Sequence, residues 1–184
     1  MLQRWANIKE FLTACNPSTQ MKYVGNELSA FADTKATLND ISLAYGKGCA
    51  KAWVIPQLYD LCEFCGCSTK LTDAQMQELA TIISLEFHYL KVSELLVFFR
   101  LMKCGKYGKF YGAVDPMAIM GALNQYVKKD RGEYIAKVEE QKKEREREEE
   151  KKIPHYYRHE WEKLHKNDKA NGQNEGEADG NTKA

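Results

Sequence analysis

The 184-residue sequence lacks any long apolar run. No window of about 18 apolar residues occurs, so the sequence predicts no transmembrane helix and no membrane partner. The N-terminal stretch MLQRWANIKEFL carries charges among its apolar positions and lacks the continuous apolar segment of a secretory signal. We therefore expect a cytoplasmic protein whose six cysteines are reduced thiols.

The sequence also lacks a strong charge of either sign. Its formal net charge is +1 at pH 7, which gives no general attraction to nucleic acid or membranes. Hydrophobic residues make up 43% of the chain and are concentrated before the polar last third. The first two thirds can therefore hold an ordinary core.

Signatures of catalysis are missing as well. No Ser/His/Asp arrangement stands out, although such triads assemble from residues far apart in sequence. The acids of the core region are scattered, and we interpret them as helix caps and surface positions: Asp40, Asp60, Asp73, Glu94 and Asp115. We expect a protein that is not an enzyme and needs no cofactor.

The cysteine-rich stretch CEFCGC is the strongest metal candidate. Cys62 and Cys65 form a CxxC pair and Cys67 adds a third thiol, but zinc sites usually need four ligands, and no second pair exists. A redox CxxC would be expected in a βαβ setting, which is absent. Buried structural thiols are therefore the favoured interpretation, with metal binding and redox chemistry as the alternatives.

Two histidines near the C-terminus are spaced for one helix face. His155 and His159 lie four residues apart, but Lys163 stands where a zinc-protease motif needs its second histidine. We expect no metal there.

Hydrophobic periodicity predicts an all-α fold, a small helical bundle. We expect helices over residues 2–14, over Leu38–Tyr45, and from Cys49 or Pro56 to Phe64. A further helix should begin at the N-cap Thr72, with Gln75 completing a capping box, and the next should run from the N-cap Ser93 through Met102. The last should begin with Asp115 as N-cap and Pro116 as first residue. Residues 18–36 are ambiguous. The helix after Ser93 is apolar on most sides, so we expect it at the centre of the bundle.

Composition divides the chain into three parts. Residues 1–138 form the helical bundle domain, because the apolar stripe ends at Val138. Residues 139–166 form a charged helical extension, whose Glu–Lys and Glu–Arg pairs can support a solvent-exposed helix. Residues 167–184 have the composition of a disordered tail.

The stretch GKYGKFYG, residues 105–112, is the most unusual motif. Its glycine spacing differs from a phosphate-binding P-loop, and it follows a helix rather than a strand. It resembles the aromatic strand of an RNA-recognition domain, but a helical protein has no sheet to present those aromatics. A connection between helices, with its rings folded onto the core, is the simplest interpretation.

A looser nucleic-acid hypothesis concerns the charges and rings around this motif. Cations and aromatic rings interleaved without an acid between them can hold single strands without sequence preference. The candidate residues are Arg100, Lys103, Lys106, Tyr107, Lys109, Phe110 and Tyr111. The alternative is that the same loop docks a protein.

The span LTDAQMQELATIISLEFHYLKVSELLVFFRLMKCGKYGKFYGAVDPMAIMGALNQYVKKDR, residues 71–131, resembles a group of uncharacterised small helical proteins from Bacteroides-type bacteria and their phages or mobile elements. The resemblance is carried by Thr72, Gln75, Tyr89, Leu90, Glu94, Gly105, Tyr107, Gly108, Phe110, Tyr111 and Arg131. It implies no activity. Its mobile-element context implies a small helical accessory or loader-like factor in DNA replication or maintenance.

Together these observations predict a non-enzymatic accessory protein associated with nucleic acid, with a protein–protein adaptor as the alternative. The expected partners are single-stranded or double-stranded DNA and a replication protein. In the DNA-binding hypothesis the lysines contact phosphates and the aromatic rings stack. The oligomeric state is left open.

Overall fold

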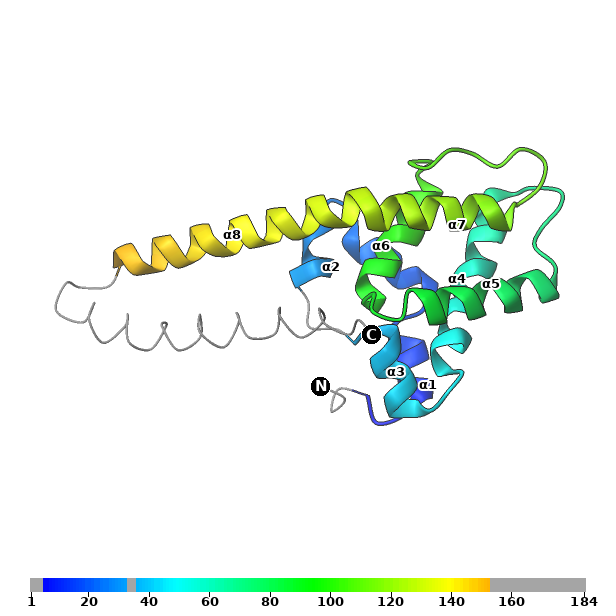
Figure 1. The fold of residues 1–184 in the computed structure, drawn as a ribbon, viewed down its shortest axis with the longest axis horizontal. Coiled ribbons are helices and arrows are strands. Elements are labelled where there is room, and N and C mark those ends of the chain that lie inside the picture. Colours follow the sequence, from blue (N-terminus) through cyan, green and yellow to red (C-terminus); the bar gives the residue numbers. More distant parts are fainter. Residues whose placement is uncertain (1–4, 33–35, 153–184) are drawn as a thin grey trace, which may run out of the picture. The chain divides into compact units, whose positions relative to one another are not determined.

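The computed structural model describes residues 5–32 and 36–152, and every regular element in these residues is helical (Figure 1). The all-α prediction is therefore confirmed for the described chain. Contacts divide the protein into two units, Met1–Val138 and Glu139–Ala184. The elements are α1 (Ile8–Ala14), the 3-10 helix η2 (Pro17–Tyr23), α2 (Leu28–Ala32), α3 (Leu38–Tyr45), α4 (Cys49–Cys65), α5 (Asp73–Glu86), α6 (Val92–Lys103), α7 (Pro116–Gln125), the π-helix η3 (Tyr126–Asp130) and α8 (Arg131–Lys152).

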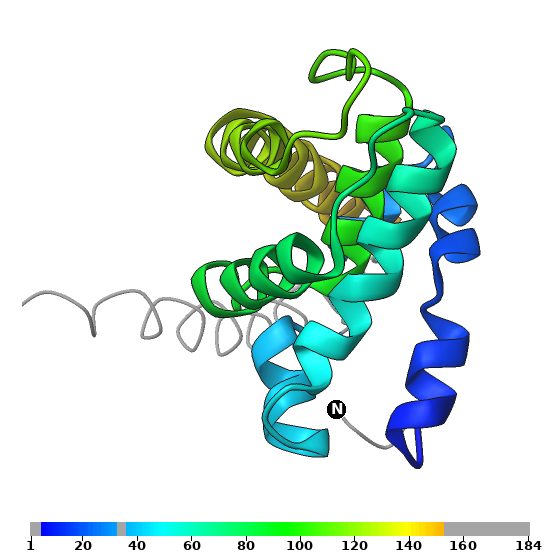
Figure 2. The same ribbon diagram turned by 90° about the vertical axis from the view of Figure 1, so that its right-hand side faces the viewer.

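Two helices, α4 and α6, form the centre of the first unit. α4 packs on α3, α5, α6 and η2, and α6 packs also on η2 and α2. Figure 2 shows α4 and α6 side by side, with the N-terminal elements on one side and α5 on the other. Every residue of α6 from Val92 to Phe99 is buried, which confirms the predicted central helix.

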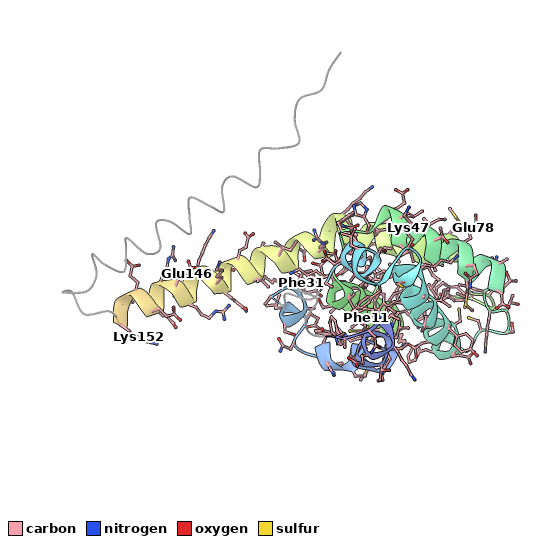
Figure 3. All side chains as sticks on the ribbon, turned by 90° about the horizontal axis from the view of Figure 1, so that it is seen from below. Phe11, Phe31, Lys47, Glu78, Glu146 and Lys152 are labelled. Atoms are coloured by element: carbon pink, nitrogen blue, oxygen red, sulfur yellow. The ribbon has the colours of Figure 1, made fainter. Side chains whose placement is uncertain are left out.

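The core is rich in aromatic rings. Phe11, Trp53 and Tyr126 are at most 1% exposed, and each such ring contributes roughly 1.5–3 kcal/mol through burial. Trp53 also donates its indole N–H to the Cys15 carbonyl over 2.7 Å, which ties α4 to the end of α1. In Figure 3 side chains crowd the region around the labelled Phe11.

Helix starts follow the local sequence signals where a capping residue is present. Thr72 and Gln75 form the predicted capping box at α5, with the Gln75 amide donating to the Thr72 hydroxyl over 3.2 Å. Asp115 accepts from the Met117 amide over 2.8 Å and Pro116 is the first residue of α7, as predicted.

Two predicted starts are wrong. Ser93 does not cap α6, because the helix begins one residue earlier and the Ser93 hydroxyl donates to the buried Ala30 carbonyl over 2.7 Å. The first helix begins at Ile8 rather than at residue 2, because the Asn7 side chain accepts from the Glu10 amide and caps it there.

Pro56 lies inside α4 rather than in a first turn, since the helix begins at Cys49. A proline leaves the carbonyl four residues earlier without its usual donor. Both Pro56 and Ala52 are exposed, so water can reach that carbonyl and the helix continues.

The C-terminal helical stretch runs without a break from α7 through η3 into α8. Beyond Val138, α8 carries the short-range pairs Lys142–Glu146 and Glu144–Arg147, and in Figure 3 Glu146 and Lys152 project from it. No helix in the described residues is long and apolar enough to span a membrane. The predicted end of the charged extension, His155, His159 and the predicted tail 167–184 lie outside the described residues.

Candidate interaction loop

The loop between α6 and α7 begins with a regular helix end. The Gly105 amide donates to Met102 O over 2.9 Å, and the Lys106 amide donates to Leu101 O over 3.1 Å. This pair of bonds is a Schellman motif, which requires a left-handed residue at Gly105, whose φ is 74°. The chain therefore reverses direction at Gly105, and the backbone of Lys106 lies against the last turn of α6.

The loop ends on the connection between α4 and α5. Gly112 O accepts from the Thr69 amide over 3.1 Å and from the Ser68 hydroxyl over 2.9 Å. The Val114 amide returns a bond to Thr69 O over 2.9 Å. Both ends of the loop are thus fixed to the bundle.

The first half of the loop is held by a buried carboxylate. Lys106 Nζ lies 2.8 Å from one oxygen of Asp130, and the Tyr107 hydroxyl donates to the other over 2.6 Å. The Tyr107 ring packs on Phe98 with ring centroids 5.9 Å apart. Asp130 itself is only 5% exposed, so these loop residues supply the partners that a buried charge needs.

Proton affinities in this cluster follow from the same contacts. Burial alone would raise the pKa of Asp130, but hydrogen bonds from Lys106 and Tyr107 outweigh it, and the pKa is lowered. Burial and the hydrogen bond to Asp130 raise the pKa of Tyr107 well above its ordinary value. At neutral pH the cluster therefore holds a neutral phenol beside an ionised carboxylate.

The two cations of α6 also bind acids within the fold. Arg100 pairs with Glu27, and its side chain is 11% exposed. Lys103 pairs with Asp60 on α4 and lies 5.5 Å from the ring centroid of Phe64. Arg100, Lys103 and Lys106 are therefore each joined to a different part of the first unit.

A second buried ion pair lies beside the loop contacts. Arg131 Nε donates to Glu94 over 2.9 Å, and Glu94 is 2% exposed. The Tyr126 hydroxyl donates to the backbone carbonyl of Glu94 over 3.0 Å. The prediction that Glu94 is a surface or capping position is wrong, because Arg131 compensates its charge inside the fold.

Of the three remaining candidate residues in the loop, Lys109 and Tyr111 face solvent. Tyr111 is 88% exposed, Phe110 is half-buried, and Lys109 is exposed and makes no ion pair with any described residue. Met117, in the first turn of α7, is 75% exposed. We call Lys109–Tyr111 the loop tip.

The structure thus separates the seven predicted binding residues into two groups. Arg100, Lys103, Lys106 and Tyr107 have acidic partners in the fold, whereas Lys109, Phe110 and Tyr111 form the loop tip. The acids Glu27, Asp60 and Asp130 were not among the predicted site residues. No local signal marks them, because each lies at least 23 positions from its partner.

Two thiols of the cysteine cluster, Cys62 and Cys65, are held in their unreactive protonated form. Cys62 is buried, Cys65 and Cys67 are half-buried, and all three are free. Burial raises the pKa of Cys62 and of Cys65, which keeps both protonated at neutral pH. Within residues 5–32 and 36–152, no group of three or more His, Cys, Asp or Glu is placed to hold a metal ion.

Comparison with known proteins gives one family. Residues 70–169 match a family of unknown function, and this span contains the loop, Glu94, Asp130 and Arg131 but begins after Glu27 and Asp60. Neither a curated protein nor a solved structure matches the chain. Because the match spans more than half of the 184 residues, the chain belongs to this family of unknown function (DUF6633).

Proposed function

We propose that the chain is a non-enzymatic, cytoplasmic binding module that docks another protein through the loop tip. The observation that carries this proposal is the exposure of Tyr111, 88%, on a loop whose two ends are bonded to the bundle. A loop held at both ends loses less conformational entropy on binding than a free segment. An exposed aromatic ring on such a support is a typical anchor of a protein interface.

The charges favour a protein over a nucleic acid as the partner. Binding to a single strand depends on several phosphate contacts, each of which releases a counterion. Three of the four predicted cations are paired with acids of the fold, which leaves Lys109. A single lysine gives little electrostatic affinity for DNA.

The proposed partner offers an apolar pocket with an acidic rim. Tyr111 would enter the pocket, and Lys109 would meet the acid beside it. Phe110, the third residue of the tip, is half-buried and packs against the core, so it does not serve as an anchor. The resemblance of residues 71–131 to proteins of Bacteroides-type bacteria and their mobile elements suggests that this partner belongs to a replication or maintenance machinery.

The direct test is affinity capture with the full chain from a lysate of the source cells, with and without nuclease. We expect a partner that survives nuclease treatment, binds the wild type, and is lost from Tyr111→Ser. The matched control is Leu43→Ser, which removes a similarly exposed side chain, 76%, from α3. A partner that is retained by Tyr111→Ser, or lost equally from Leu43→Ser, would contradict the assignment to the loop tip.

Direct nucleic-acid contact, the first expectation from the sequence, stays a prediction that a salt titration decides. The logarithm of the affinity for single-stranded DNA falls with the logarithm of salt concentration by about 0.7 per phosphate contact. All four cations together predict a slope of about −2.8, whereas Lys109 alone predicts about −0.7. The steeper slope, lost stepwise on substitution of Lys103 and Lys106, would favour the DNA-binding hypothesis over the adaptor.

A further inference from the structure

Asp130 joins two features that are far apart in the sequence. Both of its carboxylate oxygens are occupied by neighbouring loop residues, Lys106 at 2.8 Å and Tyr107 at 2.6 Å. It is also the last residue of η3, the π-turn Tyr126–Asp130. The loop and the turn therefore share one buried carboxylate.

The π-turn exists because the inward-facing residues are spaced too widely for an α-helix. Tyr126 and Asp130 are buried, and Tyr134 and Val138 are half-buried, so the inward face repeats every four residues. Three helical turns span about 10.8 residues in an α-helix, but 138 − 126 = 12 residues separate the first and last of these positions. One wide turn, closed by the Arg131 amide bonding Tyr126 O, absorbs the extra residue.

The turn brings three side chains onto their partners at once. Tyr126 and Arg131 bind Glu94 on α6, while Asp130 binds the loop. Lys129 and Glu133 each precede an inward-facing position by one residue, and both are exposed. An α-helical turn holds fewer residues than a π-turn, so each residue after Tyr126 would be rotated further round the helix. Lys129 and Glu133 would then move toward the buried face, and Arg131 would turn away from Glu94.

We propose that Asp130 couples the loop to the π-turn, so that Gly105–Gly108 and Tyr126–Arg131 are ordered or released together. Pulling Lys106 and Tyr107 away leaves a buried carboxylate without donors, and this cost is relieved only if the turn opens and exposes Asp130 to water. Opening the turn, in the other direction, removes the acceptor that holds the first half of the loop. A protein that binds the loop tip and shifts the loop would therefore also open the π-turn before α8. This consequence rests on the proposed function.

Hydrogen exchange in the free, full-length chain tests the coupling, read residue by residue by NMR. Tyr107→Phe keeps the ring on Phe98 and removes only the donor to Asp130. We expect the amides of Gly108 and Arg131 both to exchange about tenfold faster, the loss expected for a hydrogen bond to a charged group. Tyr111→Phe is the matched control, since it removes a hydroxyl from the solvent-exposed tip, and it should change neither rate.

The reciprocal variant perturbs the turn from the side of α6. Glu94→Gln weakens the pair with Arg131 and leaves the loop residues intact, and we expect faster exchange at Gly108 as well as at Arg131. The amide of Leu58, in the buried centre of α4, reports global unfolding. Faster exchange on one side only would overturn the proposal. Opening free energies at Gly108 and Arg131 equal to that of Leu58 would overturn it as well, because both amides would then exchange only through global unfolding. Because no partner is present, this result is independent of whether the loop tip docks a protein.

Discussion

Gly105–Tyr107 and Gly108–Tyr111 each contain a glycine, a lysine and a tyrosine, yet the fold treats them in opposite ways. Lys106 and Tyr107 bind the buried Asp130, whereas Lys109 and Tyr111 face solvent. Composition is nearly the same in the two halves, so composition does not decide which half can reach a partner. The position of one carboxylate on η3 decides it.

The comparison also separates two uses of positive charge. A lysine beside a buried acid compensates a charge that the core cannot tolerate alone, and it is therefore not available to phosphates. A lysine on the loop tip has water as its partner and can exchange it for an acid on another protein. Four comparisons between variants test this division, in order of decreasing expected effect.

Removing the carboxylate of Asp130 should have the largest effect on stability. Asp130→Ala should lower the free energy of unfolding by about 2–4 kcal/mol, because it removes the buried acceptor of the half-buried Tyr107 hydroxyl and the partner of the more exposed Lys106. Chemical denaturation measures this difference. Glu133→Ala, an exposed acid three residues further along, should change the free energy by less than about 0.5 kcal/mol. Equal losses of unfolding free energy in the two variants would mean that the contacts of Asp130 do not stabilise the fold.

Removing only the hydroxyl group should affect Tyr107 and Tyr111 differently. Tyr107→Phe should cost about 1–2 kcal/mol of unfolding free energy, because one oxygen of Asp130 loses its donor while the ring stays packed. Tyr111→Phe should cost nothing measurable, since its hydroxyl is hydrated in both states. Thermal unfolding of both variants under one buffer condition provides the measurement, and a reversed order would contradict the structure.

The glycine that opens the loop should respond differently from a glycine in α7. Gly105 has a φ of 74°, so Gly105→Ala should destabilise the protein by about 1 kcal/mol through strain at the end of α6. Gly121 lies within α7 and has open space around it, so Gly121→Ala should stabilise by about 0.5–1 kcal/mol through helix propensity. Denaturant midpoints compare the two, and the same sign for both would contradict the assigned conformation of Gly105.

Acid should gradually remove the stability that the ionised Asp130 contributes. The pKa of Asp130 is lowered in the fold, so its ionised form contributes stability above its unfolded pKa of about 3.8, and this contribution is lost as the pH falls through the lowered folded value. The stability of wild type relative to Asp130→Asn should therefore be constant near neutrality and shrink below about pH 4. Urea denaturation across this range measures the change. A difference that grows toward acid pH would show that the pKa is raised instead.

Local signals in the sequence predicted a large part of the fold. Leu38–Tyr45 and the central α6 follow from hydrophobic periodicity, and the starts of α5 and α7 follow from capping residues within three positions of each other. Ser93 was misassigned because its hydroxyl found a partner 63 positions away, at Ala30. Capping patterns report the helix only when no distant acceptor competes for the same side chain.

The π-turn depends both on a local spacing of residues and on a distant partner. The four-residue spacing of Tyr126, Asp130, Tyr134 and Val138 is present in the sequence and is too wide for a plain α-helix. Asp130 is charged, however, so it does not count as an inward-facing residue until its partners on the loop are known. The predicted apolar stripe ran on to Val138, but without Asp130 it gave no sign of the wide turn at Tyr126–Asp130.

Local sequence alone was enough for most of the helices, for the caps of α5 and α7 and for the glycine-aromatic loop, because these depend on residues a few positions apart and on the burial of apolar side chains. The pairing of the cations inside the fold was settled by tertiary contacts alone. This pairing depends on Glu27, Asp60, Glu94 and Asp130, whose partners lie between 23 and 73 positions away. A charge in the sequence has no fixed environment, and the fold alone decides whether its partner is an acid in the core or the solvent.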